Sequence, residues 1–176
     1  SRMQRQGGME YYPEEIGLQP LAQETVELLS QMAGKKGIEL NCTIEEGVSV
    51  YADKNMIDTV IRNLASNALK FTPQGGTVTI SAQCMNSSKG DKGADFVQVL
   101  VIDTGIGMSQ KEVDQLFRLD VNHSTLGTDR EEGSGLGLII CKEMVERNGG
   151  EIWVRSEVDE GTAVEFTVPQ VALSPS

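Results

Sequence analysis

The segment from Asp53 to Phe71 constrains the fold more than any other part of the sequence. Its apolar residues recur at helical spacing and form the single stripe that an amphipathic helix buries against a core: Ile57, Val60, Ile61, Leu64, Ala65 and Ala68. Asp53 is a suitable N-cap, and Pro73 with Gly75 and Gly76 ends the pattern. We therefore expect a helix over 53–71 that packs on a sheet.

The remaining elements follow one another without strict alternation of helix and strand. Helical periodicity begins at Pro20 and ends at Gly34 and Gly37, and another helix is expected over 136–147. Ser109 and Glu112 have the spacing of a capping box that opens a short helix. Strands are expected over 38–43, 48–51, 77–82, 96–102, 152–154 and 163–168. The run over 96–102 is almost wholly apolar, which predicts a central strand covered on both faces.

These elements predict an α+β fold, a two-layer sandwich that forms one domain. The length of 176 residues suits one domain with a sizeable core. Residues 1–17 are polar and hold no core pattern, so we interpret them as a linker. The domain itself is expected over 18–170, with a C-terminal tail over 171–176.

The composition excludes several classes of protein. Lys and Arg total 15 against 26 Asp and Glu, a net charge of −11, which lacks the basic footprint of a nucleic-acid-binding protein. No apolar run approaches the roughly 18 residues that span a bilayer, and no signal peptide is visible, so we expect a cytoplasmic domain without membrane contact. Cys42, Cys84 and Cys141 are far apart, which predicts buried free thiols and neither a disulfide nor a zinc site.

Three polar side chains border the apolar stripe of the 53–71 helix. At about 100° per residue, Asn63, Asn67 and Lys70 fall on one arc of about 60°. An asparagine oxygen is a hard ligand suited to Mg²⁺, and a lysine ammonium attracts anions. The helix alone does not distinguish such a site from a solvated polar edge.

Two glycine-rich segments follow the expected strand over 96–102 and open the expected helix over 136–147. In the first, over 103–108, Asp103 can accept a hydrogen bond from an exocyclic amine such as that of adenine. In the second, over 133–138, bare backbone N–H groups at a helix N-terminus can bind phosphate. Its glycine spacing fits neither the dinucleotide-binding pattern nor a P-loop. An ordinary Asp–Gly turn and a flexible helix start are the alternatives.

In their order and spacing, these motifs resemble those of sensor histidine kinases, members of the GHKL superfamily. The segment 63–72 is similar to the N box, the segments 103–107 and 133–138 to two glycine boxes, Phe117 to the F box and Gly161–Thr162 to the last small-residue motif. The resemblance implies the Bergerat fold that DNA gyrase and heat-shock chaperone ATPases share. In that fold, a mixed and mostly antiparallel sheet is covered by about three helices on one face, with a mobile lid between Met108 and Gly133.

The resemblance also implies roles for single residues. Asn67 matches the Mg²⁺ ligand, and Asn63 and Lys70 match residues around the metal and the phosphates. These three would be the catalytic residues, and Asp103 would accept from the adenine amine. The other residues that match the nucleotide-binding pattern are Gly105, Gly107, Gly133, Gly135, Leu136, Gly137 and Thr162. The lid residues His123, Ser124 and Arg130 could each reach a phosphate, and the pattern does not choose between them.

The function implied by the resemblance is phosphoryl transfer in a two-component system. The chain would bind Mg-ATP and donate the γ-phosphoryl group to a histidine on a separate dimerisation domain, with a response regulator downstream. Residues 1–17 would then be the remnant of the linker from that domain. Hydrolysing relatives carry a glutamate where this chain has Asn63, and His123 would be a lid residue and no phosphoacceptor. The alternative is a nucleotide-dependent regulatory module, or a serine kinase of the anti-sigma-factor type.

Overall fold

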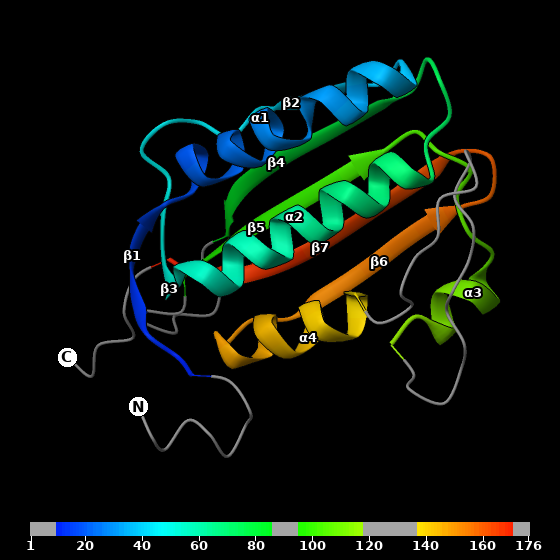
Figure 1. The fold of residues 1–176 in the computed structure, drawn as a ribbon. Helices are drawn as coiled ribbons and strands as arrows, with labels where there is room; N and C mark the ends of the chain where they lie inside the picture. The colour runs from blue at the N-terminus through cyan, green and yellow to red at the C-terminus, as the bar shows by residue number, and fades with distance from the viewer. Residues whose placement is uncertain (1–9, 86–94, 118–136, 171–176) are drawn as a thin grey trace.

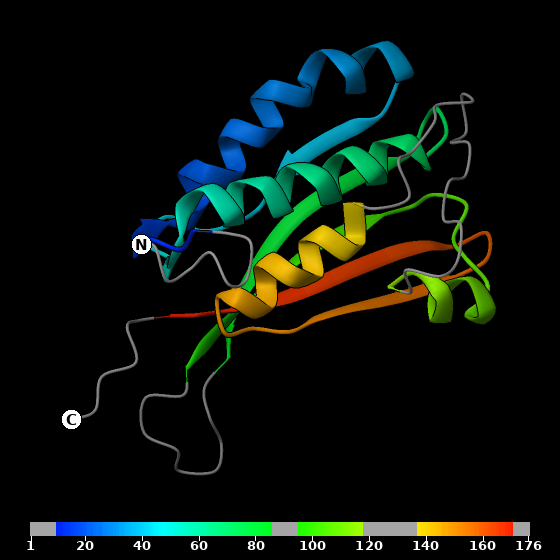
Figure 2. The same cartoon turned by 60° about the horizontal axis from the view of Figure 1, so that its bottom comes forward.

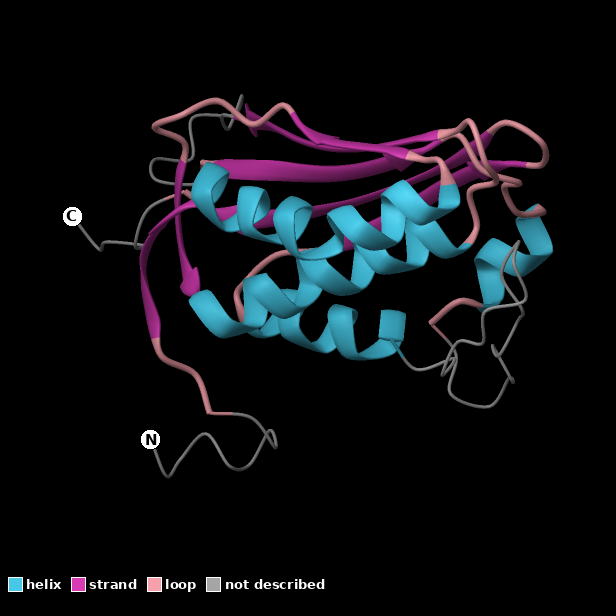
Figure 3. Ribbon diagram, turned by 45° about the horizontal axis from the view of Figure 1, so that its top comes forward, coloured by secondary structure: helices cyan, strands magenta, loops and turns pink. Residues whose placement is uncertain are grey.

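The computed structural model describes residues 10–85, 95–117 and 137–170. Within these ranges, α1 (Leu18–Lys36), α2 (Lys54–Lys70) and α4 (Gly137–Arg147) lie on one face of a five-stranded sheet (Figure 1). Figure 2 shows α2 between the other two helices. The short α3 (Gln110–Gln115) lies apart from them, at one end of the sheet (Figure 3). The predicted two-layer α+β sandwich is confirmed.

The sheet is mixed and mostly antiparallel, as predicted. Its strands run in the order β2 (Glu39–Cys42), β4 (Thr77–Met85), β5 (Phe96–Asp103), β7 (Gly161–Pro169) and β6 (Ile152–Glu157). Only β2 and β4 are parallel among these neighbours within the described ranges, and the other three pairs are antiparallel. Because β5 and β6 both run antiparallel to β7, the C-terminal ends of β5 and β6 meet the start of β7 at one end of the sheet.

The central strand β5 is covered on one face only. Val97, Val99 and Val101 point toward the helices and are at most 1% exposed, whereas Ile102 is 39% exposed. Figure 3 shows the described helices on a single side of the sheet. The prediction of a strand covered on both faces is therefore wrong. A continuous apolar run leads to this error because it is compatible with a strand whose second face is only half-buried.

Polar side chains cross the face of the sheet that the described helices leave uncovered. Gln83 Nε2 donates to Gln98 Oε1 (2.6 Å), and Gln98 Nε2 donates to Glu165 Oε1 (2.8 Å). Arg155 forms an ion pair with the other oxygen of Glu165. The network joins β4, β5, β7 and β6, and Trp153 lies on the same face, 41% exposed. The half-buried apolar residues of this face therefore lie among polar side chains, which water can solvate.

A second, two-stranded sheet holds an element that sequence reasoning missed. β1 (Pro13–Gly17) pairs antiparallel with β3 (Ser49–Asp53), and Ile16 is buried in the core. The interpretation that residues 1–17 hold no core pattern is wrong for this segment. A single inward side chain in five residues produces no periodic signal.

The predicted cap of α2 also joins α2 to the end of α4. Asp53 Oδ1 accepts from Met56 N (3.1 Å), which confirms the N-cap, and Asp53 Oδ2 accepts from Tyr12 N (2.8 Å). The backbone N–H of Asp53 donates to Asn148 Oδ1 (2.8 Å), and Asn148 Nδ2 donates to Met144 O (2.7 Å). The N-terminus of α2 is thereby fixed against both β1 and α4.

The three cysteines are free thiols, as predicted, but only Cys141 is buried. Burial raises the pKa of the Cys141 thiol to about 12. Cys42 lies on the edge strand β2 and is half-buried, and Cys84 is exposed near the end of β4. The prediction of buried thiols is wrong for these two, because they occupy an edge and a strand end. None of the described helices is both long and apolar enough to cross a membrane.

Candidate functional site

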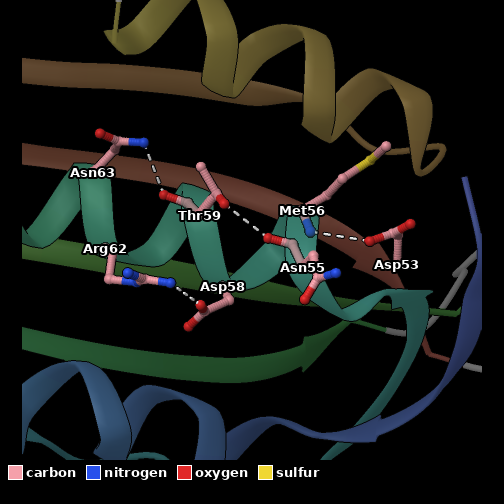
Figure 4. Close-up of polar contacts among 7 residues, drawn as sticks. All are labelled: Asp53, Asn55, Met56, Asp58, Thr59, Arg62 and Asn63. Carbon is pink, nitrogen blue, oxygen red and sulfur yellow. Dashed lines mark hydrogen bonds and ion pairs between the residues drawn. The ribbon is translucent and has the colours of Figure 1, made fainter. Parts of the chain in front are cut away.

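The helix α2 carries Asn63, Asn67 and Lys70 half-buried along one edge. They adjoin an apolar stripe that is at most 5% exposed: Ile57, Val60, Ile61, Leu64, Ala65 and Ala68. Asn63 Nδ2 donates to Thr59 O at 2.9 Å, which holds this carboxamide along the helix (Figure 4). Within the part of the chain that the structure describes, the Asn67 carboxamide makes no hydrogen bond. Its oxygen is therefore available to a ligand.

The other charged groups on this part of α2 are held by local contacts. Arg62 forms an ion pair with Asp58 one turn earlier (Figure 4). The Lys70 ammonium lies over the ring of Phe71, 5.7 Å from its centroid. A shallow hollow beside α1 is lined by Leu29, Thr59, Arg62, Asn63 and Ser66. Asn63 borders this hollow, and Figure 4 shows its side chain on the edge of α2 that faces α4, away from Arg62. Asn67 comes about one turn later along the same edge of the helix.

Asp103 ends β5 and is 8% exposed. Its Oδ1 accepts from Gly105 N (2.8 Å) and from Thr162 N (3.2 Å), while Oδ2 makes no hydrogen bond with any described residue. Desolvation by burial raises the pKa of this carboxyl, and the two backbone N–H groups lower it in part. One oxygen is anchored and the other can accept from a ligand.

The turn after Asp103 packs directly on the C-terminal end of α2. Ile106 N donates to Phe71 O (3.1 Å), and Ile106 O accepts from Asp159 N (2.7 Å) in the β6–β7 turn. Glycine is required for this approach, because a Cβ on Gly105 would lie 2.2 Å from Phe71 O. Gly107 has φ +71°, and a Cβ there would lie 1.9 Å from Glu157 O. The unbonded oxygen of Asp103, Oδ2, therefore lies beside the C-terminal end of α2, which carries Lys70.

Ser156 of β6 is a residue of this site that no motif contains. Its Oγ accepts from Met108 N (2.8 Å), lies 3.0 Å from Gly161 O and lies 2.7 Å from Thr162 Oγ1. It thereby ties the turn after Asp103 to the start of β7. The only signal that could have found it is the hairpin register that pairs Ser156 with Thr162, which the sequence does not specify.

The structure places the predicted site residues in three groups. Those around the C-terminal half of α2 and the strand ends packed against it are Asn63, Asn67, Lys70, Asp103, Gly105, Gly107 and Thr162. Gly137 begins α4, which packs beside α2. Those outside the described residues are Gly133, Gly135, Leu136, His123, Ser124 and Arg130, together with residues 118–132 of the lid expected between Met108 and Gly133.

The short helix α3 confirms the predicted capping box. Ser109 Oγ accepts from Glu112 N (3.2 Å), and Glu112 Oε1 accepts from Ser109 N (2.8 Å). Phe117 follows this helix and is half-buried. The turn after Asp103 therefore leads directly into a fixed helical start.

The donor set of α2 fits magnesium better than a metal held by the protein alone. Among the described residues, no group of three or more His, Cys, Asp or Glu could hold a metal ion. A half-buried asparagine oxygen without a carboxylate cage suits Mg²⁺, which keeps several waters and takes its other ligands from substrate phosphates. The side-chain oxygens of Asn63 and Asn67 both lack hydrogen bonds with described residues, and the residue that matches the Mg²⁺ ligand by resemblance is Asn67.

The mixed sheet under three helices, with a buried aspartate where its central strand ends, defines a domain of the GHKL class. Residues 52–172 match the family of histidine kinase-, DNA gyrase B-, and HSP90-like ATPases. This chain belongs to that family.

The relatives and solved structures are histidine kinases in the main. The chain is 35% identical over 154 residues to the adaptive-response sensory kinase SasA of Gloeothece citriformis, covering 86% of this chain and 37% of that protein. It is 31% identical over 163 residues to the non-motile and phage-resistance protein of Caulobacter vibrioides, covering 93% of this chain and 19% of that protein. The chain therefore spans less than half the length of these relatives.

Solved structures give the same result for the fold. The catalytic domain of histidine kinase ThkA superimposes with a TM-score of 0.74 at 27% identity, covering 92% of this chain and 97% of that one. Full-length ShkA in complex with AMPPNP superimposes with a TM-score of 0.74 at 28% identity, covering 96% of this chain and 33% of that one. The predicted resemblance to histidine kinase catalytic domains is confirmed.

Proposed function

We propose that this chain binds Mg-ATP and donates the γ-phosphoryl group to a histidine on a separate dimerisation domain. The observation that carries the proposal is the hydrogen bond from Ile106 N to Phe71 O (3.1 Å). It holds the open oxygen of Asp103 against the helix end that presents Lys70, one turn beyond Asn67. One site then offers an acceptor for a base and polar groups for phosphates.

Each end of the nucleotide has a matching group. Asp103 Oδ2 accepts from the adenine amine, and Asn67 supplies the one protein oxygen on α2 for Mg²⁺. The metal, when bound, neutralises phosphate charge, which phosphoryl transfer requires. Lys70 and Asn63 border the same phosphates, and the resemblance assigns phosphate contacts to the glycine-rich segment that holds Gly133, Gly135, Leu136 and Gly137. Such local help is necessary because the chain carries a net charge of −11.

The side chain of Asn63 supports transfer over hydrolysis. An amide has no useful basicity, so it cannot take a proton from an attacking water. Its Nδ2 is also engaged with Thr59 O at 2.9 Å. The acceptor is therefore a group that is already nucleophilic, and an imidazole of the partner domain meets that need. Catalysis then comes from positioning and charge neutralisation.

The wider assignment follows the sensory kinases that the chain resembles. We place it in a cytoplasmic two-component kinase, with the dimerisation domain and a response regulator as partners. The catalytic domain covers residues 18–170, to which β1 is packed, and residues 171–176 form a tail.

Incubation with γ-labelled ATP tests the proposal. The chain alone should bind ATP, stay unlabelled and turn ATP over very slowly. Addition of a separately expressed dimerisation domain that carries a phosphoacceptor histidine should label that partner, with acid-labile and base-stable phosphate. Steady ATP turnover by the chain alone would indicate an ATPase instead, and labelling of a partner serine would indicate a kinase of the anti-sigma-factor type.

A further inference from the structure

Three polar side chains form a row across the strand ends next to the site. Asp103 of β5 is directly opposite Thr162 of β7, and Thr162 is directly opposite Ser156 of β6. Directly paired residues point to the same face of a sheet, and alternation from the buried Val101 puts this face toward the helices. Ser156 is thus the third member of a row that begins with the proposed adenine acceptor.

The hydrogen-bond capacity of Ser156 determines the direction of its contact with Thr162. A hydroxyl donates one proton and accepts two. Ser156 accepts from Met108 N (2.8 Å), and its proton is the only one that can satisfy the contact with Gly161 O (3.0 Å). In the 2.7 Å contact with Thr162 Oγ1, Ser156 must then be the acceptor. This is the one arrangement that satisfies all three contacts at once.

We propose that Ser156 is a positioning residue that fixes the Thr162 hydroxyl as a hydrogen-bond acceptor toward the base. The Thr162 proton is directed at Ser156, so the lone pairs of Thr162 Oγ1 are what this hydroxyl presents to the site. When Asp103 is ionised, its Oδ2 can likewise accept a hydrogen bond but cannot donate one. The side chains of Asp103 and Thr162 therefore offer only acceptors to a base. This favours a base with an amine at that place and disfavours a base with a carbonyl there. This inference rests on the proposed nucleotide site.

Removal of the Ser156 hydroxyl should change the discrimination between two bases. In Ser156→Ala, Thr162 loses the acceptor for its proton, so its hydroxyl can turn and donate to a carbonyl. Inosine triphosphate carries that carbonyl in place of the adenine amine. We expect the ratio of affinities for ATP and inosine triphosphate to fall roughly five- to tenfold, which corresponds to one reoriented hydrogen bond.

The measurement is calorimetric titration of the full chain with each nucleotide in the presence of Mg²⁺. Ser156→Thr keeps the hydroxyl and should keep the wild-type ratio. Ser81→Ala is the matched control, because Ser81 lies on the uncovered face of β4 and its hydroxyl makes no hydrogen bond with a described residue. This control should change neither affinity.

The ratio separates positioning from a general loss of structure. A purely structural role would weaken both nucleotides equally in Ser156→Ala, and an unchanged ratio would overturn the inference. If Ser156→Ala fails to fold, Ser156→Cys keeps a group of similar shape with weak hydrogen bonding, and a wild-type ratio in that variant would also overturn it. Wild-type protein that binds neither nucleotide would refute the proposed function itself, a different result from binding with an unchanged ratio.

Discussion

At the scale of single residues, Asp103 combines the binding role that we propose with an energetic cost to the fold. We expect Asp103→Asn to weaken ATP binding, because its amide can turn a donor toward the adenine amine. A mispaired buried donor costs about 1–3 kcal/mol, roughly a ten- to hundredfold loss of affinity. Calorimetry measures this loss, and Asp58→Asn on the surface of α2 is the control. Equal affinity in wild type and Asp103→Asn would show that Asp103 has only a structural role.

The same substitution should act on stability in a pH-dependent way. Burial raises the pKa of Asp103 above its ordinary value of 3.8. The stabilisation that comes from the neutral carboxyl is complete below 3.8 and is lost as the pH rises through the raised value. Asparagine is neutral at every pH, so Asp103→Asn does not lose this stabilisation. The melting temperature of the variant relative to wild type should therefore increase as the pH rises from below 3.8 to neutral. Thermal unfolding of both proteins below pH 3.8 and at neutral pH checks this. A difference in melting temperature that does not change with pH would contradict it.

Asn67 offers a test of the phosphate end of the site. Asn67→Ala removes the oxygen that we assign to Mg²⁺, so Mg-dependent ATP binding should be lost while folding is kept. Asn55→Ala is the matched control, because Asn55 is an exposed asparagine on the same helix (Figure 4). Titrations with and without Mg²⁺ give the comparison. Unchanged Mg²⁺ dependence in Asn67→Ala would remove the metal assignment.

At the scale of elements, the turn between β5 and α3 depends on close backbone contact. Gly107 and Gly47 both have positive φ, +71° and +91°, but only Gly107 has a neighbour that a Cβ would strike. Gly47→Ala should cost about 1–2 kcal/mol of unfolding free energy, the left-handed strain alone. Gly107→Ala should cost more and should also weaken ATP binding, because the turn must move. Urea unfolding of both variants measures the difference, and equal costs would show that the clash relaxes freely.

Sequence reasoning was most successful for elements with a strong period or a specific cap. The helix at 54–70, its Asp53 cap and the Ser109–Glu112 box all form as predicted. It missed β1, whose single buried residue Ile16 carries no period. It also misjudged β5, because an apolar run does not reveal which face a helix will cover.

Some residues of the candidate site could likewise be predicted from the sequence, and others could not. The motif residues could be predicted because their types and spacing repeat in a known family. Ser156 could not, since its contacts depend on the register between β6 and β7 and on the path of the turn to Met108. Information of that kind exists only once the strands are paired.

At the scale of the whole molecule, β1 tests where the folded unit begins. A chain that starts at residue 18 loses the burial of Ile16 and the bond from Tyr12 N to Asp53. We expect it to lose about 2–4 kcal/mol of unfolding free energy. A chain that starts at residue 10 keeps β1 and is the control. Urea unfolding compares them, and equal stability would mean that β1 adds nothing to the domain over 18–170.

The alternation of β6 has an optical consequence. Trp153 is the chain's single tryptophan, and it lies 41% exposed on the face of the sheet that the described helices leave uncovered. The row of Ser156, Thr162 and Asp103 lies on the opposite face, so the sheet itself separates the indole from any bound base. Intrinsic emission should therefore be red-shifted and open to collisional quenchers in the native protein. A fluorescence titration without a label would be blind to nucleotide, even where binding is tight.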